Sequence, residues 1–127
     1  MEEHKPYEQI RKRPCDFIVR YTFYTEEQGG RKTGTPRQGI RSDFMYDGDT
    51  LDDGLYGIWP EFLDENNNII LDRNIHVPVS GKAKMWMLDD NFFNYHKSRM
   101  KIGTRGYFME GSHKTAECEV VEFIHLK

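Results

Sequence analysis

The chain has 127 residues, of which 37% are hydrophobic and 13% are aromatic. This length and composition fit one domain around one core and exclude an intrinsically disordered chain. The formal net charge of −3 at pH 7 excludes a chain that binds nucleic acid through an overall positive charge, so a phosphate-binding site has to be a local patch.

Cysteine content and the lack of long apolar segments indicate the cellular setting. The two cysteines, Cys15 and Cys118, are too few for a disulfide-rich scaffold; free thiols are the expectation, and a redox-active pair is the alternative. The opening MEEHKPYEQIRKRP has no apolar core of a secretory signal, and no apolar run reaches the roughly 18–20 residues that span a membrane. We therefore expect a cytoplasmic protein with no membrane partner.

The first residues differ in pattern from the segment that follows them. Residues 1–14 are charged and contain two prolines, which predicts a flexible charged N-terminal arm ahead of a single β-barrel domain at residues 15–127. In the next stretch, CDFIVRYTFYT, the period becomes two, and one face carries Phe17, Val19, Tyr21 and Phe23. This alternation predicts the first strand.

Further strands follow, separated by turns rich in Gly, Asp and Asn. Pro60 restricts its segment to a sheet edge or a bulge, residues 69–80 are expected to be extended with a bend near Pro78, and residues 89–103 hold a short helical turn. The other expected strands are GIRSDFMYDG (39–48), LYGIWPEFL (55–63), KAKMWML (82–88), TRGYFMEG (104–111) and AECEVVEFIHL (116–126). About six strands without an amphipathic helix indicate a sandwich or a small closed barrel, and the barrel is favoured because it has no exposed edge.

The loop TEEQGGRKTGTPRQG, residues 25–39, is rich in glycine and basic residues. A nucleotide-binding P-loop needs Lys and Ser or Thr directly after its last glycine, and it leads into a helix. Here Thr35 and Pro36 follow Gly34, and the next element alternates as a strand. We therefore expect a connection between two strands, with no bound nucleotide and no cofactor.

Other candidate motifs fail on spacing. The turn DGDTLDDG (47–54) has four carboxylates, but Leu51 and Ile58 stand where a calcium loop needs its fifth and twelfth residues, so we expect a solvated turn. The five histidines lack zinc-site spacing, and no nucleophile elbow is present. We expect no metal, no catalytic residue and no enzyme activity; a small enzyme of unknown chemistry is the least favoured alternative.

Three clusters of basic residues are candidates for contact with phosphate. They are residues 11–13, Arg31 and Lys32 with Arg37 and Arg41, and residues 96–101. Each Lys or Arg contact with a phosphate would make binding weaker at higher salt. The alternative is a solvated surface, which is the common role of such clusters.

Both ends of the strand region resemble the third domain, the C-terminal β-barrel, of elongation factor Tu. In FYTEEQGGRKTGTPRQGIRSDFMY the matching positions are Glu26, Glu27, Gly29, Gly30, Arg31, Thr33, Gly39, Arg41 and Phe44, with Lys32 in place of the family's His. In MKIGTRGYFMEGSHKTAECEVVEFI they are Gly103, Thr104, Glu110, Gly111, Val120 and Val121. The resemblance spans residues 15–126, and its two ends are the specific parts.

The resemblance implies a single closed six-stranded antiparallel Greek-key barrel that acts as a non-catalytic binding module. In that family the barrel contacts partner proteins and the T-stem backbone of aminoacyl-tRNA, so it implies a protein partner and a translation-related role, with RNA as the alternative. The residues implied in RNA or partner binding are Arg31, Lys32, Arg37, Arg41, Gly111, His113 and Lys114. The match includes no part of the family's GTPase domain, so we expect no GTP, and we expect no DNA. The family's hairpin Arg is replaced here, which weakens the expectation of tRNA binding.

Overall fold

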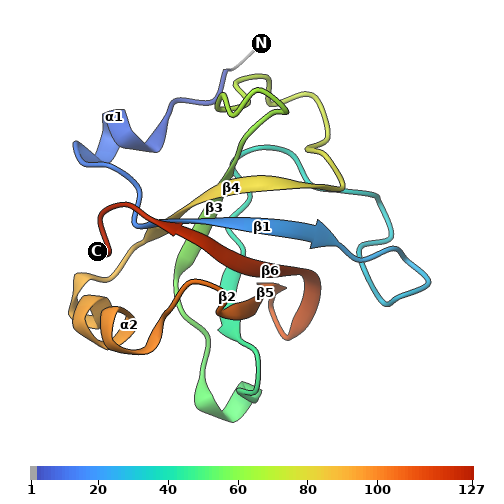
Figure 1. The fold of residues 1–127 in the computed structure, drawn as a ribbon. Helices are drawn as coiled ribbons and strands as arrows, with labels where there is room; N and C mark the ends of the chain where they lie inside the picture. Colours follow the sequence, from blue (N-terminus) through green and yellow to red (C-terminus); the bar gives the residue numbers. More distant parts are fainter. Residues whose placement is uncertain (1–2) are drawn as a thin grey trace.

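One antiparallel sheet dominates the computed structural model, which describes residues 3–127. Within these residues the sheet has six strands in the order β2-β5-β6-β1-β4-β3 (Figure 1). The strands are β1 (Phe17–Phe23), β2 (Asp43–Tyr46), β3 (Ile58–Phe62), β4 (Ser80–Met87), β5 (Arg105–Glu110) and β6 (His113–Phe123). The prediction of a mainly β fold with six antiparallel strands is confirmed.

The helices are short and lie outside the sheet. They are α1 (Tyr7–Arg11) and α2 (Phe93–Arg99), with single turns η1 (Leu51–Asp53) and η2 (Asp90–Phe92). The expected helical turn within residues 89–103 is confirmed by η2 and α2. No helix in the described part of the chain is both long and apolar enough to cross a membrane.

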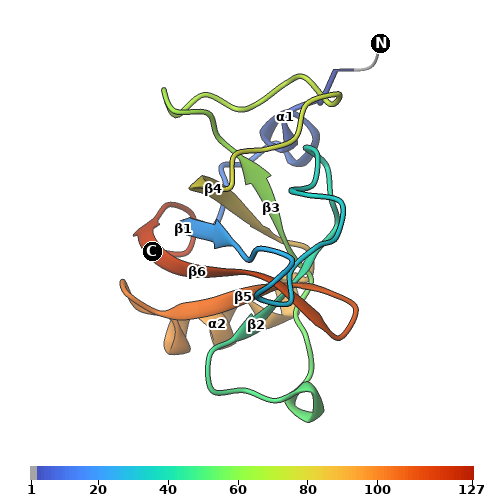
Figure 2. The same ribbon diagram turned by 90° about the vertical axis from the view of Figure 1, so that its right-hand side faces the viewer.

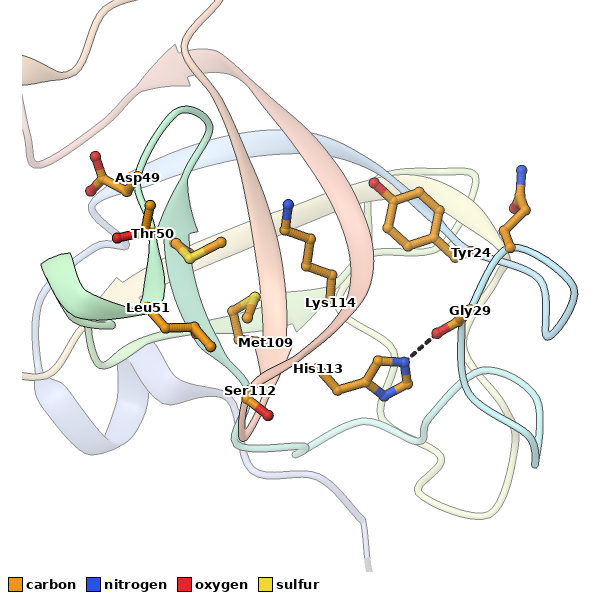
Figure 3. Close-up of a pocket in the computed structure, with 11 residues that line it drawn as sticks. Tyr24, Gly29, Asp49, Thr50, Leu51, Met109, Ser112, His113 and Lys114 are labelled. Carbon is orange, nitrogen blue, oxygen red and sulfur yellow. Dashed lines mark hydrogen bonds between the residues drawn. The ribbon is translucent and has the colours of Figure 1, made fainter.

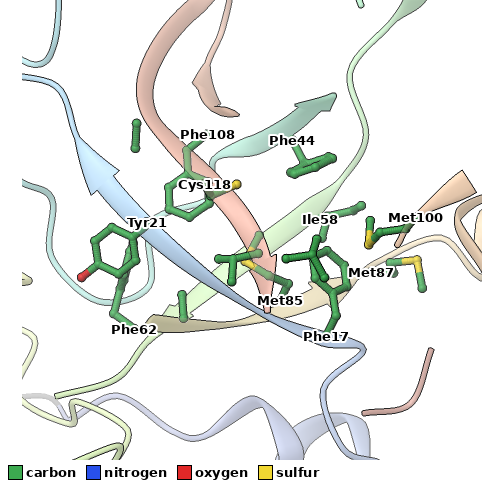
Figure 4. Close-up of a cluster of buried hydrophobic side chains, with 14 of the residues drawn as sticks. Phe17, Tyr21, Phe44, Ile58, Phe62, Met85, Met87, Met100, Phe108 and Cys118 are labelled. Carbon is green, nitrogen blue, oxygen red and sulfur yellow. The ribbon is translucent and has the colours of Figure 1, made fainter. Parts of the chain in front are cut away.

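The inward side chains of all six strands meet in one core. β1 alternates between buried and more exposed positions, as its sequence period predicts. The Tyr21 ring lies 5.1 Å from the ring of Phe62 and 5.9 Å from that of Phe108, centroid to centroid (Figure 4). Inclined aromatic pairs at such distances add to the free energy gained by burying apolar area. The core therefore joins β1, β3 and β5, which are far apart in the sequence.

The prediction of a closed barrel is wrong. β2 and β3 are the two ends of the sheet, which is strongly curled into a half-barrel (Figures 1 and 2). Beyond their core contacts, these ends are joined by one bridge, in which Phe44 and Tyr56 exchange two backbone hydrogen bonds of 2.9 Å. β2 has only four residues, and a proline interrupts β3, so neither edge supports a full ladder.

A side chain takes the place of a neighbouring strand at the β3 edge. Gln38, which is 2% exposed, donates from Nε2 to the carbonyl oxygens of Phe62 and Ile70 at 2.9 Å each. Its Oε1 accepts a 2.8 Å hydrogen bond from the backbone N–H of Phe62. The loop after β1 thus satisfies backbone groups that closure of a barrel would have paired.

The sequence predicts a flexible arm at residues 1–14. Residues 1 and 2 lie outside the described part, and in residues 3–14 His4 is buried whereas the other side chains are exposed or half-buried. His4 is 4% exposed, and its Nε2 lies 2.6 Å from Oε2 of Glu61, which is 0% exposed. Glu61 also accepts hydrogen bonds from the backbone N–H of Tyr7 (2.9 Å) and from Nε1 of Trp86 (3.1 Å). The fully buried carboxylate needs these partners, which explains why the segment docks.

Candidate functional site

The basic loop (residues 25–39) and the hairpin between β5 and β6 lie side by side. His113 Nε2 hydrogen-bonds to the carbonyl oxygen of Gly29 (Figure 3). Arg31 Nη1 lies 2.5 Å from Oε1 of Glu110 at the end of β5. Six of the seven residues expected in RNA or partner binding therefore lie on these two neighbouring segments, and they are Arg31, Lys32, Arg37, Gly111, His113 and Lys114.

Glycine is required where the basic loop turns tightly against β1. The backbone N–H groups of Gln28 and Gly30 both donate to the carbonyl oxygen of Thr25, at 3.0 and 2.8 Å. A Cβ on Gly30 would lie only 2.2 Å from the carbonyl oxygen of Tyr24. Gly29 has a φ of +91°, a conformation that side chains disfavour. These glycines shape the loop, as the sequence analysis predicted for a strand connection.

A groove of about 680 Å³ lies between the basic loop, the hairpin and the turn after β2 (Figure 3). We call it the loop–hairpin groove. Its floor includes Met45 and Met109, which are 3% and 1% exposed and lie outside the core cluster. Its rim includes Tyr24, Leu51 and Lys114. The groove thus combines an apolar floor with a mixed rim.

A bulge in β6 places Lys114 beside the floor of the loop–hairpin groove. Phe108 pairs with Ala116 but Met109 pairs with Lys114, so Thr115 is the extra residue. Lys114 Nζ lies 3.9 Å from the ring centroid of Tyr107, within the range of a cation–π contact. The ammonium group is therefore held on the outer face of the sheet next to Met109.

A second groove of about 460 Å³ adjoins the first and is lined by the exposed Lys32 with Arg31, Glu110 and His113. Arg31 also donates from Nε to the carbonyl oxygen of Gly34 at 2.9 Å. Glu110 and Gly34 take two of the five N–H donors of the Arg31 guanidinium, and the Glu110 carboxylate offsets its charge. Acidic groups therefore offset the positive charge of this surface.

Arg37 and Arg41 do not line either of these two grooves. Arg37 forms an isolated backbone bridge with His76, in the loop before β4. The Arg41 guanidinium lies 5.3 Å from the ring centroid of Trp59 in β3. The structure thus splits the expected binding residues into a loop–hairpin group and a pair near β3.

Both cysteine side chains are buried, and the described residues form no cluster of possible metal ligands. Cys15 and Cys118 are free and buried, and burial raises the pKa of both thiols, that of Cys15 to about 12. Such thiols stay protonated and are weak nucleophiles. Among residues 3–127, no group of three or more His, Cys, Asp or Glu side chains is placed to hold a metal ion.

The acidic turn 47–54 has structural roles beyond solvation. Asp53 Oδ2 accepts a 2.7 Å hydrogen bond from the backbone N–H of Thr50, which caps η1. Asp49, on the rim of the loop–hairpin groove, binds both terminal nitrogens of Arg99 at 2.8 and 3.2 Å. The turn is therefore tied to α2.

The sequence analysis missed an aromatic cluster in which His96 is central. His96 is 1% exposed, its Nδ1 lies 2.7 Å from Tyr46 Oη, and burial, with a smaller effect of Arg99, lowers its pKa to about 4. Arg99 lies 3.8 Å from the Tyr46 ring centroid and donates to Tyr95 Oη at 2.6 Å. Phe92, His96 and Arg99 are spaced four and three residues apart, which places them on one face of a helix. This spacing is the sequence pattern that could have predicted the cluster.

No model of a known protein family matches the sequence, and no curated protein matches it.

Proposed function

We propose that this chain is a non-catalytic binding module that holds a protein partner in the loop–hairpin groove. The observation that carries this proposal is the buried pair Met45 and Met109 beneath the groove, outside the core. Methionine side chains are flexible and polarizable, and they adapt to varied apolar ligands. A groove of about 680 Å³ lies within the usual size range of recognition pockets.

The rim of the loop–hairpin groove favours a partner of mixed charge. Lys114 and Asp49 both line it, so it offers one cation together with a carboxylate whose charge is partly offset by Arg99. Tyr24 adds a hydroxyl whose pKa is raised to about 12, first by burial and then by the Glu117 carboxylate, so it stays protonated. A protein surface supplies complementary groups of both signs together with apolar side chains for the floor.

RNA is the alternative partner, favoured by the exposure of Lys32, Arg37, Arg41, His113 and Lys114. The ion pair of Arg31 with Glu110 weighs against it, because it removes a cation from the surface. A titration with tRNA at two salt concentrations tests this alternative. The chain should bind tRNA at low salt and more weakly at higher salt, and Lys32→Ala should lower the affinity for tRNA. If tRNA binding lacks these properties, the RNA alternative is excluded.

We further propose kinship with the third barrel domain of elongation factor Tu, with a cytoplasmic, translation-related role and a Greek-key connection of the strands. The proposal rests on the loop and hairpin residues quoted above. A small enzyme is the least favoured reading, because the buried Cys15 and Cys118 thiols have raised pKa values.

Affinity capture with the wild-type chain and with a groove variant tests the partner proposal. Leu51 is 51% exposed and Lys114 is exposed, so Leu51→Asp combined with Lys114→Glu alters the rim and leaves the core intact. We expect a discrete protein that resists nuclease treatment, with recovery reduced at least tenfold by the double variant. Ile102→Asp, at a 61% exposed position outside the groove, is the matched control and should retain the partner.

Two outcomes would contradict the proposal. A captured species that disappears after nuclease treatment would favour RNA. Equal capture by the wild type and the groove variant would place the binding surface elsewhere.

A further inference from the structure

A second, smaller pocket lies beside η2 and α2 and shares no lining residue with the loop–hairpin groove. Its volume is about 250 Å³. Tyr56 and Phe92 form aromatic walls, Leu55 and Met87 form aliphatic walls, and Asp89 and His96 are its charged or polar side chains. We call it the His96 pocket. This volume is below the usual range for drug-sized ligands, which starts at about 300 Å³, so a ligand no larger than a single ring is expected.

The hydrogen bond between His96 and Tyr46 determines which ring nitrogen carries the proton. Tyr46 is 2% exposed, and among the described residues its hydroxyl has one hydrogen-bond partner, His96 Nδ1 at 2.7 Å. A buried hydroxyl hydrogen needs an acceptor, so Nδ1 accepts and the neutral ring carries its hydrogen on Nε2. Because His96 lines the pocket and its Nδ1 is occupied, Nε2–H is the donor left for a ligand.

The His96 ring is neutral and fixed in orientation. Its pKa of about 4 means that it carries no charge at pH 7. It stacks on Tyr46 at 5.8 Å and meets the edge of Tyr56 at 4.7 Å, centroid to centroid. Arg99 holds Tyr46 from its ring face. The donor is therefore preorganised, so binding would cost little ordering of the side chain.

Asp89 supplies the complementary acceptor. Its Oδ1 accepts a 2.9 Å hydrogen bond from the backbone N–H of Asn91, and the exposed carboxylate keeps acceptor capacity for a ligand. This carboxylate disfavours an anion in the pocket, whereas the Nε2–H of His96 requires a ligand that carries a hydrogen-bond acceptor. An uncharged ligand fits both groups.

We propose that the His96 pocket binds a small, uncharged, planar ring compound that accepts a hydrogen bond from His96 Nε2 and donates one to Asp89. Its ring packs against Tyr56 and Phe92. Aromatic carboxamides and nucleobases share this chemistry. The site is independent of the partner proposed for the loop–hairpin groove.

Titration of the full chain with nicotinamide and with uracil, followed by ¹H–¹⁵N NMR, tests this site and distinguishes the two sources of the chemistry. Saturable shifts of the Gly57, Phe92 and His96 amides with either probe support the proposal. Nicotinate, the anionic counterpart of nicotinamide, should bind at least fivefold more weakly than nicotinamide. Absence of saturable shifts with both neutral probes, or equal binding of nicotinate and nicotinamide, overturns the proposal.

Three variants and the ¹⁵N shifts of the His96 ring test the site further. Phe92 is 45% exposed, so Phe92→Ala should leave the chain folded, with the NMR spectrum of a folded protein. The variant should bind the probe at least fivefold more weakly than the wild type does. Unchanged affinity overturns the proposal. Asp89→Asn should reduce the difference between the affinities for nicotinamide and nicotinate. Ile102→Ala, outside the pocket, should leave both affinities unchanged. The ¹⁵N shifts of the His96 ring should show hydrogen on Nε2; hydrogen on Nδ1 overturns the assignment.

Discussion

Gln38 and His96 are buried polar side chains whose partners are distant in the sequence. Gln38 bonds to the backbone of Phe62 and Ile70, and His96 bonds to the hydroxyl of Tyr46. A buried group that loses its partner costs more free energy than the hydrogen bond itself contributed. Each of these residues therefore has an effect on stability that its place in a loop or short helix does not indicate.

Replacing Gln38 should destabilise the fold strongly. Gln38→Leu removes three hydrogen bonds to the Phe62 and Ile70 backbones and leaves those groups buried, so we expect a loss of about 3 kcal/mol in the free energy of unfolding. Urea denaturation measures this loss. Gln9→Leu, at an exposed position in α1, should change stability by less than about 0.5 kcal/mol. A loss below about 1 kcal/mol for Gln38→Leu would contradict the role assigned to its side chain.

The lowered pKa of His96 should make the folded state less stable in acid. The unfolded chain takes up a proton on this ring near pH 6.5, whereas the folded chain does so only near pH 4. Its contribution is therefore fully present above about pH 6.5 and falls by about 2 kcal/mol between pH 7 and pH 4.5. Urea denaturation across this range should show a loss larger by that amount in the wild type than in His96→Phe. Parallel pH profiles would contradict a neutral, buried His96.

At the scale of elements, a buried pair is one of the contacts that attach the segment containing α1 to the sheet. His4 and Glu61 are joined at 2.6 Å, and Glu61 also holds the Tyr7 backbone N–H, so the segment before β1 is fixed to β3. The backbone N–H of His4 donates to the carbonyl oxygen of Leu71 at 2.8 Å, a second attachment point. The N-terminal segment is thus part of the packed structure.

Removal of the His4 side chain should release this segment. His4→Ala removes one of the three partners of the fully buried Glu61 side chain and leaves the hydrogen bonds from Tyr7 and Trp86, and we expect a loss of about 3 kcal/mol in stability. Cleavage of residues 3–14 by trypsin should become at least fivefold faster. Glu8→Ala, at an exposed position of α1, serves as the control. Unchanged cleavage of the His4→Ala chain would show that the segment is held by other contacts.

Local pattern predicted the strands well and the connections between distant segments poorly. The alternation of apolar residues in the β1 sequence matches the alternation of buried and more exposed positions in the strand. Pro60 correctly indicated that its strand, β3, lies at the edge of the sheet. The pattern of single strands did not predict the open edge at β3, where the side chain of Gln38 bonds to the backbone of Phe62. The docking of His4 likewise requires a partner 57 residues away.

The candidate site was predictable to a similar extent. The sequence indicated the basic loop and the hairpin, and the structure places them side by side through His113 and Gly29. The sequence did not indicate that Met45 and Met109 form the floor of the loop–hairpin groove. The pairing of β2 with β5 and the bulge in β6 bring these two side chains together. Arg37 and Arg41 were grouped with the loop by sequence proximity alone.

On the scale of the whole molecule, one chain of contacts joins the two candidate binding sites. Asp49 on the rim of the loop–hairpin groove binds Arg99, and Arg99 lies over the ring of Tyr46. Tyr46 is hydrogen-bonded to His96, which lines the His96 pocket. The acidic turn, β2 and α2 therefore form one structural unit between the sites.

The ion pair at Asp49 should contribute little to stability on its own. Both side chains are partly exposed, at 32% for Arg99 and 13% for Asp49, so we expect Asp49→Asn to cost about 1 kcal/mol or less. Thermal denaturation measures this change, and Asp52→Asn, an exposed neighbour in the same turn, is the control. A loss well above about 2 kcal/mol would mean that the pair holds α2 in place.

Site-specific photo-crosslinking tests most directly whether the loop–hairpin groove binds a protein. A photoreactive phenylalanine analogue is placed at Leu51, on the groove rim, or at Ile102, which is exposed and outside the groove. Irradiation in cell extract should yield one discrete protein adduct from position 51 that withstands nuclease, is absent from position 102 and is lost with Lys114→Glu. Equal adducts from both positions, or an adduct from position 51 that nuclease removes, would contradict a protein partner in this groove.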